Sequence, residues 1–428
     1  MSALVCSHPR GPRPDRMCRH LADDEDVSYV IRFTGGGVDH VLVCADCRDA
    51  PLESLVEVCG ECFRERQWSV FYMDGFTGAP EVLSRPTSLH LEHRDVAVPA
   101  LARFSLRAVA PCPDPARSLW LAVTDRGDLA RIDLDARIVD PVVSLPGAAV
   151  PLDQEMGVVP SPCGRFAAVV STKGRYGVVV DLTSGAVTMT LDRGNYHEDV
   201  QEYSVAFFLD GDRTLLVHAT EWNRLDISDP LTGALLTPRD TTWHQGQPEP
   251  PHYLDYFHAG LTVSADGRWL VDDGWVWHPV GVLRALDLRR WAHENVWESE
   301  DGPSVVTLRQ AAYFWDAPRC FVADGILAVG GFGSDDEHML DAALLFDVRT
   351  GELTRWFAGP PCRGRFVFDE LLFCTAKERG TSAWDVATGE RVFHDPAFSP
   401  AAYHPGLRRF LTPGEGGVLR TSALAGGR

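Results

Sequence analysis

Short apolar runs alternate with turn signals along most of the chain, from about residue 68 to the C-terminus. A typical unit opens with two apolar runs separated by an Asp-Gly turn, as in residues 261–271 (LTVSADGRWLV). A third apolar run then ends in Asp and is followed by Thr-Gly or Ser-Gly, as in residues 178–185 (VVVDLTSG). Because Asp accepts backbone N–H groups in turns and Gly adopts positive φ, this pattern predicts antiparallel strands joined by tight turns.

The Asp at the end of the third run recurs at intervals that match one propeller blade. The six clearest copies, spaced 48, 48, 58, 60 and 38 residues apart, are Asp133, Asp181, Asp229, Asp287, Asp347 and Asp385. Four-stranded blades with loops of varying length have this period. We therefore predict blades near residues 100–147, 155–192, 201–238, 255–292, 309–358 and 362–394, with about three further strands in 401–424.

A ring of blades has to close without leaving an open strand edge. We expect a strand within residues 69–83 to pair with the last strands of the chain and complete the final blade. This count gives a seven-bladed β-propeller over residues 67–428, with eight blades as the alternative. The order of strands and turns resembles the blade pattern of WD40-like and quinoprotein-like β-propellers, and the third apolar run of one unit ends in the pair Trp384-Asp385. The resemblance implies an all-β fold and no particular function, because one propeller architecture serves many functions.

The first 66 residues have a different composition, since six of the 11 cysteines lie in residues 1–62. Two C-x2-C knuckles, Cys44/Cys47 and Cys59/Cys62, have a spacing that lets four thiolates bind one tetrahedral zinc ion. We expect two shorter pairs, Cys6/His8 and Cys18/His20, to form a second metal site or to replace ligands of the first. We therefore expect one or two structural zinc ions.

Residues 27–43 (VSYVIRFTGGGVDHVLV) predict two short strands around a glycine turn that leads into the first knuckle. A hairpin followed by a knuckle is typical of small zinc ribbons and treble clefs, so we predict such a module over residues 1–66. Thiolate-rich knuckles are typical of closed structural sites, which disfavours catalysis at the metal. We expect the module to pack against the first and last blades.

Charge and hydropathy narrow the classes of partner. A net charge of −20 repels phosphate backbones and anionic lipids, which disfavours nucleic-acid and membrane-surface partners. No run of 18 apolar residues is present, and Pro and Arg interrupt the first 20 residues, so neither a membrane span nor a signal peptide is predicted. We expect a cytoplasmic protein, and the 38 arginines against two lysines suggest a GC-rich bacterial genome.

Two segments, residues 241–258 and 272–297, concentrate Trp and His in predicted loops, a composition typical of binding surfaces. With loop residues from neighbouring blades, the candidate binding residues are His197, Trp222, Trp243, His244, His252, His258, Trp275 and Trp277. No catalytic sequence motif is present. The sequence favours a non-catalytic scaffold that binds a protein partner, and it leaves a small-molecule ligand open.

The alternative function is a propeller enzyme, a hydrolase or lyase acting on a sugar or small metabolite. Such an enzyme would use His and Asp/Glu groups from separate blades around the central channel. Convergence at the channel mouth would favour the enzyme, whereas scattered positions would favour the scaffold. The residues for this comparison are His197, His218, His244, His252, His258 and Asp272.

Overall fold

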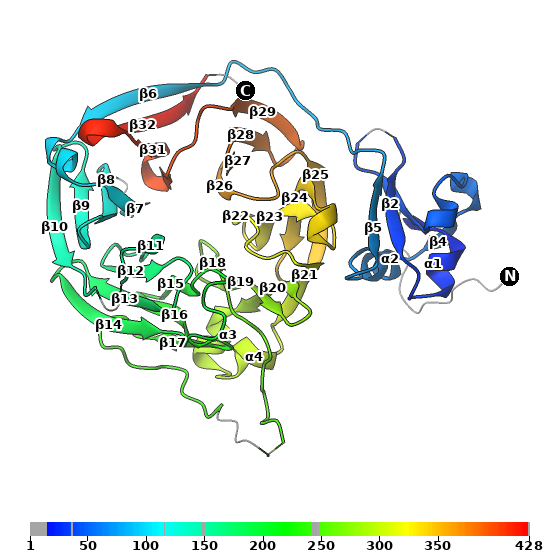
Figure 1. Ribbon diagram of the computed structural model, residues 1–428, viewed down its shortest axis with the longest axis horizontal. Helices are drawn as coiled ribbons and strands as arrows, with labels where there is room; N and C mark the ends of the chain where they lie inside the picture. Colours follow the sequence, from blue (N-terminus) through cyan, green and yellow to red (C-terminus); the bar gives the residue numbers. More distant parts are fainter. Residues whose placement is uncertain are drawn as a thin grey trace.

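The computed structural model describes residues 15–35, 37–114, 116–147, 150–241, 246 and 248–426. Seven small antiparallel sheets surround a central axis, and an eighth sheet lies beside the ring (Figure 1). The chain is thus a seven-bladed β-propeller preceded by a small N-terminal module, as predicted. The first strand of each blade lies nearest the axis, and the last lies on the outside.

The blades follow one another in sequence order. Blade 1 contains β7 (Leu106–Pro111), β8 (Leu119–Thr124), β9 (Asp128–Asp133) and β10 (Ile138–Ser144). Blade 2 contains β11 (Met156–Pro160), β12 (Phe166–Ser171), β13 (Tyr176–Asp181) and β14 (Ala186–Asp192). Blade 3 contains β15 (Val205–Asp210), β16 (Arg213–Glu221) and β17 (Arg224–Ser228).

Blade 4 is interrupted by two short helices between its third and fourth strands. It contains β18 (Leu261–Val263), β19 (Trp269–Val276), β20 (Val280–Asp287), α3 (Leu288–His293), α4 (Glu298–Asp301) and β21 (Val306–Ala312). Blade 5 contains β22 (Arg319–Ala323), β23 (Ile326–Phe332), β24 (Leu340–Asp347) and β25 (Glu352–Ala358). Blade 6 contains β26 (Arg365–Asp369), β27 (Leu371–Ala376), β28 (Gly380–Asp385) and β29 (Glu390–Asp395).

Blade 7 closes the ring with strands from both ends of the repeat region. Its C-terminal strands are β30 (Ala402–His404), β31 (Arg409–Pro413) and β32 (Val418–Ala425). The outer strand β6 (His90–Ala97) pairs with β32 along its whole length, from Ala97 opposite Val418 to His90 opposite Ala425. The prediction that the closing strand lies within residues 69–83 is therefore wrong. The strand in that region, β5 (Met73–Thr77), belongs to the N-terminal sheet, whereas β6 is mostly exposed and polar.

The six recurring Asp residues do what their positions predict. Five of them end the third strand of their blade and Asp229 directly follows it, and in each case one carboxylate oxygen accepts the backbone N–H two residues later at 2.9 Å. In blades 1 to 4 the same carboxyl also pairs with an arginine that lies just before or at the start of the second strand. These ion pairs are Arg117–Asp133, Arg165–Asp181, Arg213–Asp229 and Arg268–Asp287. The carboxyl thus joins two turns at the same end of its blade.

Blade 3 replaces its missing fourth strand with side chains. After a single bridge between Ser228 and Leu235, the chain leaves the sheet, so β17 has an open edge in its remaining length. Thr237 accepts the N–H of Ile227 at 3.0 Å, and Arg239 donates to the carbonyl of Leu225 at 2.7 Å. These two contacts satisfy backbone groups that a fourth strand would otherwise pair.

The N-terminal module is a five-stranded sheet with two helices. Its strands, in the spatial order β4-β1-β3-β2-β5, are β4 (Val56–Val58), β1 (Asp15–Met17), β3 (His40–Val43), β2 (Tyr29–Phe33) and β5. Its helices are α1 (Arg19–Asp23) and α2 (Gly60–Gln67). Because β5 lies at the edge of this sheet, the module extends beyond the predicted boundary at residue 66.

The module packs against blade 5. Phe332, which is fully buried at the end of β23, stacks on Trp356 with ring centroids 4.1 Å apart and meets the His40 ring edge-on at 5.4 Å. The Tyr29 hydroxyl lies 2.8 Å from the Ser334 hydroxyl. The expected contact with the first and last blades is therefore wrong. One apolar core runs from the module into blades 4 and 5 instead.

Within the described part of the chain, no helix is both long enough and apolar enough to cross a membrane.

Candidate metal centre and loop-face aromatic patch

The topology of the module brings Cys18 and Cys44 together. Strands β1 and β3 run parallel with Met17 opposite Leu42, and each of the two cysteines directly follows the end of its strand. The N–H of Cys18 bonds to the carbonyl of Leu42 at 2.9 Å, and the Cys18 sulfur accepts the N–H of Cys44 at 3.3 Å. Cys47 joins them through the knuckle turn, in which its N–H bonds to the carbonyl of Cys44 at 3.1 Å.

Together with His20 at the start of α1, these cysteines form a four-membered cluster. The ligand atoms of Cys18, His20, Cys44 and Cys47 all lie within 4.8 Å of one another. The His20 Nδ1 atom is 3.3 Å from the Cys44 sulfur and 3.4 Å from the Cys47 sulfur. Zinc bonds of about 2.3 Å to sulfur and about 2.0 Å to nitrogen place such atoms about 3.5 Å apart in a tetrahedron. The cluster therefore has the ligand set and the spacing of a structural zinc site.

The thiol pKa values show why the cluster favours a cation. Burial tends to raise the pKa of Cys44, but hydrogen bonds from the His20 ring and the Cys47 backbone hold it below its usual value. Burial, together with the neighbouring sulfurs of Cys44 and Cys18, raises the pKa of Cys47 to about 11. The neighbouring sulfurs thus oppose the ionisation of Cys47, and a divalent cation in the cluster removes that repulsion.

The second knuckle lies at the other end of β1. Strand β4 runs antiparallel to β1 with Val58 opposite Asp15, so Cys59 follows β4 where β1 begins, whereas Cys18 follows β1 where it ends. Cys59 caps α2, and its sulfur accepts the N–H of Cys62 at 3.3 Å. The structure therefore groups the first knuckle with Cys18 and His20, in place of the pairing of two knuckles that their spacing suggested. Cys6 and His8 lie outside the described residues.

The face of the propeller that carries the blade-to-blade connections holds most of the predicted binding residues. Because the strands of each blade alternate in direction, this face also carries the turns between second and third strands, and we call it the loop face. The connection between β14 and β15 crosses the channel there. Lys173 of blade 2 pairs with Asp316, which precedes blade 5, at 3.0 Å, and Glu202 lies 3.7 Å from Arg319 of blade 5. Blades 2 and 5 lie on opposite sides of the axis, so this connection spans the channel mouth.

A set of aromatic residues surrounds this connection. Phe257 and Trp275, both buried, stack with their rings 4.0 Å apart and form the floor. Tyr196 and Trp222 pack on Phe257 at 5.5 and 4.5 Å, and His197 contacts Trp277 at 5.0 Å.

Tyr196 and Trp277 are 45% and 42% exposed. We define the aromatic patch as Tyr196, His197, Trp222 and Trp277. Sequence reasoning did not select Tyr196, although it directly precedes the candidate His197.

The other predicted binding residues have different surroundings. His258 is buried, and its Nδ1 bonds to the Asp272 carboxylate at 2.6 Å. His252 stacks on Trp297 and contacts the Asp301 carboxylate at 2.8 Å. Trp243 and His244 lie outside the described residues.

Among the described residues, the histidines considered for the enzyme alternative do not share a hydrogen-bond partner. His218 is buried and bonds to the Ser228 hydroxyl at 3.0 Å, and only His258 bonds to Asp272. Both members of this pair are 3% exposed or less, so neither is open to a substrate. Among the described residues, these histidines therefore do not form one convergent set.

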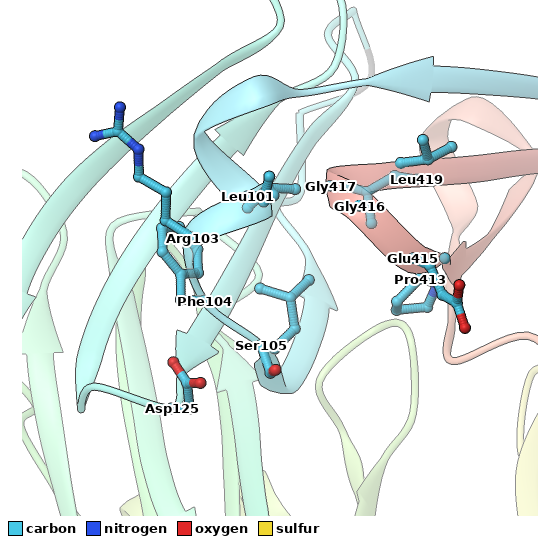
Figure 2. A pocket seen from close by; sticks show the side chains of 14 residues that line it. Leu101, Arg103, Phe104, Ser105, Asp125, Pro413, Glu415, Gly416, Gly417 and Leu419 are labelled. Atoms are coloured by element: carbon cyan, nitrogen blue, oxygen red, sulfur yellow. The ribbon is translucent and has the colours of Figure 1, made fainter.

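A cavity of about 600 Å³ lies at the seam between blades 7 and 1 (Figure 2). Its walls are residues 101–106 and 413–419, with Asp125 and Glu415 on opposite sides. None of the predicted binding residues lines it. The seam cavity is therefore separate from the aromatic patch.

No family model matches the chain, and no curated protein matches it. Among solved structures, the chain is similar to one in a structure described as "Crystal Structure of Mitotic Checkpoint Complex". The two chains are 13% identical, the match covers 81% of this chain and 96% of the other, and the TM-score is 0.49. The description of this chain as a propeller rests on its own seven sheets.

Proposed function

We propose that this protein is a non-catalytic scaffold that binds a protein partner through the aromatic patch on the loop face. The observation that carries the proposal is the exposure of the Tyr196 and Trp277 side chains, which both contact the His197 ring, beside a packed aromatic floor. Contiguous exposed aromatic surface is uncommon on soluble proteins and is typical of interfaces, where Tyr and Trp supply much of the binding energy. Because the floor is already packed, the patch loses little entropy on binding.

The proposal is tested with a Tyr196→Ala/Trp277→Ala variant. Proteins crosslinked to the wild-type chain in its host are identified, and the enriched partner is purified for direct titration. We expect the variant to weaken binding at least about tenfold, since each hot-spot side chain contributes about 1–2 kcal/mol or more. Phe71→Ala removes an aromatic side chain that is 52% exposed in the N-terminal module, and it should bind normally. Equal affinity of the patch variant and the wild type would refute the proposal.

We also propose that the module holds two structural zinc ions. The described cluster combines a C-x-H pair with a C-x2-C knuckle, and the sequence contains the same combination a second time in Cys6/His8 and Cys59/Cys62. The second knuckle lies beside Asp15, the first residue that the structure describes.

Zinc content per chain tests this proposal. We expect about two ions in the wild type, and a loss of one in Cys59→Ser/Cys62→Ser that leaves the first cluster loaded. A single zinc ion that survives in this variant would refute the second site without affecting the first. A wild-type chain without zinc would refute both sites.

A further inference from the structure

We propose that the aromatic patch binds a proline-rich segment of the protein partner in the polyproline II conformation. This inference rests on the proposed function, because it names the kind of segment that the patch recognises. Three features of the patch support it: the order and spacing of its rings, the polar groups at their tips, and the packing that holds them in place.

The rings of the patch form a row in which each ring contacts the next. Trp222 contacts Tyr196 with ring centroids 5.2 Å apart, Tyr196 contacts His197 at 4.6 Å, and His197 contacts Trp277 at 5.0 Å. All three contacts are steep, with interplanar angles of 68°, 70° and 80°. The row therefore presents ridges and notches in place of one flat face, and proline rings pack on aromatic surfaces of this kind.

The spacing of the two exposed rings matches the repeat of a polyproline II helix. The ring centroids of Tyr196 and Trp277 lie 4.6 and 5.0 Å from that of His197, so they are at most about 9.6 Å apart. Such a helix has three residues per turn and a rise of about 3.1 Å per residue, which places every third side chain about 9 Å further along the same face. Two prolines one turn apart therefore pack one on each exposed ring.

The polar groups of the patch complement a segment that offers acceptors and few donors. Within the described part of the chain, the indole N–H groups of Trp222 and Trp277 and the hydroxyl of Tyr196 have no hydrogen-bond partner. The floor differs, since the indole N–H of Trp275 donates to the Gln201 side chain at 3.3 Å. Proline has no backbone N–H, and the carbonyls of a polyproline II helix make no internal hydrogen bonds, so they accept from these side chains.

A cavity continues the row beyond Trp222. Its volume is about 430 Å³, and its aromatic lining residues are Trp222 and Tyr253. Trp222 packs on buried Phe257 at 4.5 Å, and the Asn223 side chain donates to the carbonyl of Leu254 at 2.9 Å, which connects the turn of Trp222 to the segment of Tyr253. These walls are in place before a ligand arrives, and a polyproline II helix is also preformed, so both sides lose little entropy on binding.

The test uses the full chain labelled with 5-fluorotryptophan, with the Trp222 and Trp277 signals assigned by comparison with Trp222→Phe and Trp277→Phe. The probes are N-acetyl-decaproline amide, a flexible peptide of alternating glycine and serine of equal length, and a helical peptide of two Glu-Ala-Ala-Ala-Lys repeats. We expect a saturable shift of the Trp277 signal with decaproline, and affinity at least about tenfold weaker for the other two peptides. No shift with decaproline, or equal or tighter binding of either other peptide, would overturn the inference.

Two variants of the patch test the roles of its rings and its donors. Trp277→Phe keeps an aromatic ring but removes the indole N–H, so it should weaken decaproline binding about two- to tenfold, the effect of one lost hydrogen bond. Tyr196→Ala/Trp277→Ala removes both exposed rings and should weaken it at least about tenfold. Phe71→Ala, which removes an exposed aromatic side chain in the N-terminal module, is the control and should bind decaproline as the wild type does. Unchanged affinity in either variant of the patch would also overturn the inference.

Binding of the purified partner separates this inference from the proposed function. We expect decaproline to compete with the partner for the wild-type chain. If partner affinity falls in Tyr196→Ala/Trp277→Ala but decaproline neither binds nor competes, the patch is the interface and the polyproline inference is rejected. If partner affinity is unchanged in this variant, both proposals are rejected.

Discussion

Replacing Arg239 with Met tests how blade 3 remains stable without a fourth strand. The Arg239 side chain is 1% exposed, and it donates to Asp226 at 2.6 Å, to Glu300, and to the carbonyl of Leu225 at 2.7 Å. Methionine removes these bonds, leaves the buried Glu300 carboxylate without its cation and leaves Asp226 with Arg224 as its remaining cation. Breaking a buried ion pair from one side costs about 3–5 kcal/mol.

That free energy converts into a measurable change in melting temperature. The propeller spans residues 90–426, and an unfolding entropy of about 2.1 cal/mol/K per residue gives about 0.7 kcal/mol/K for about 340 residues. The expected decrease in Tm is therefore roughly 4–7 °C, measured by circular dichroism at one scan rate.

The matched control is Arg420→Met, which breaks an ion pair of similar geometry at the surface. Arg420 contacts both carboxylate oxygens of Asp95 at 2.7 and 2.9 Å, but both side chains are 50% exposed. Exposed pairs contribute about 1 kcal/mol or less, so its Tm should fall by at most about 1–2 °C. Adding Glu300→Gln to Arg239→Met should recover part of the loss, since it removes one unpaired charge. Equal decreases in Tm for Arg239→Met and Arg420→Met would refute this reasoning.

Three further predictions concern other parts of the fold. The Arg165 hydrogen bond holds the pKa of Asp181 below its usual value despite burial. The ionised Asp181 carboxylate therefore stabilises the fold above about pH 4, and this stabilisation is lost as the pH falls through the lowered pKa of the folded state. The Tm difference between wild type and Asp181→Asn should be constant from pH 7 to 5 and shrink below pH 4. Phe332→Ala should destabilise the contact between the module and blade 5 by about 3–5 kcal/mol. Limited proteolysis should then cleave the module faster than the propeller. Equal cleavage rates of the module in wild type and variant would contradict this prediction. Deleting residues 90–97 should abolish cooperative unfolding of the ring because β32 loses its partner, whereas a sharp transition at the wild-type Tm would show that closure depends on another strand.

The parts of the fold that follow from local chemistry were predictable from the sequence. The Asp turns could be located because each carboxylate bonds to the backbone two residues later, a contact contained within the motif. Strand β6 was missed because only one of its eight residues is buried, so its sequence, HLEHRDVA, carries little of the apolar pattern that predicts strands.

The candidate sites depend more on long-range pairing. The grouping of Cys18 with Cys44 follows from the parallel pairing of β1 with β3, which no spacing along the chain reveals. His197, Trp222, Trp275 and Trp277 were selected from composition, and the structure places them in one aromatic assembly. The exposed Tyr196 of the patch was not selected, because an isolated aromatic residue in a loop gives no periodic signal.

The pairing of β6 with β32 also determines when the ring can form during protein synthesis. Strand β6 leaves the ribosome before any blade, whereas its partner is made more than 300 residues later. Until then, blades 1 to 6 form an open arc, and β6 exposes its backbone hydrogen-bonding edge to other chains. A translation product interrupted before β32 therefore contains β6 without its partner strand and cannot complete blade 7. The ring therefore reaches its full stability only after the last strand, β32, has been made.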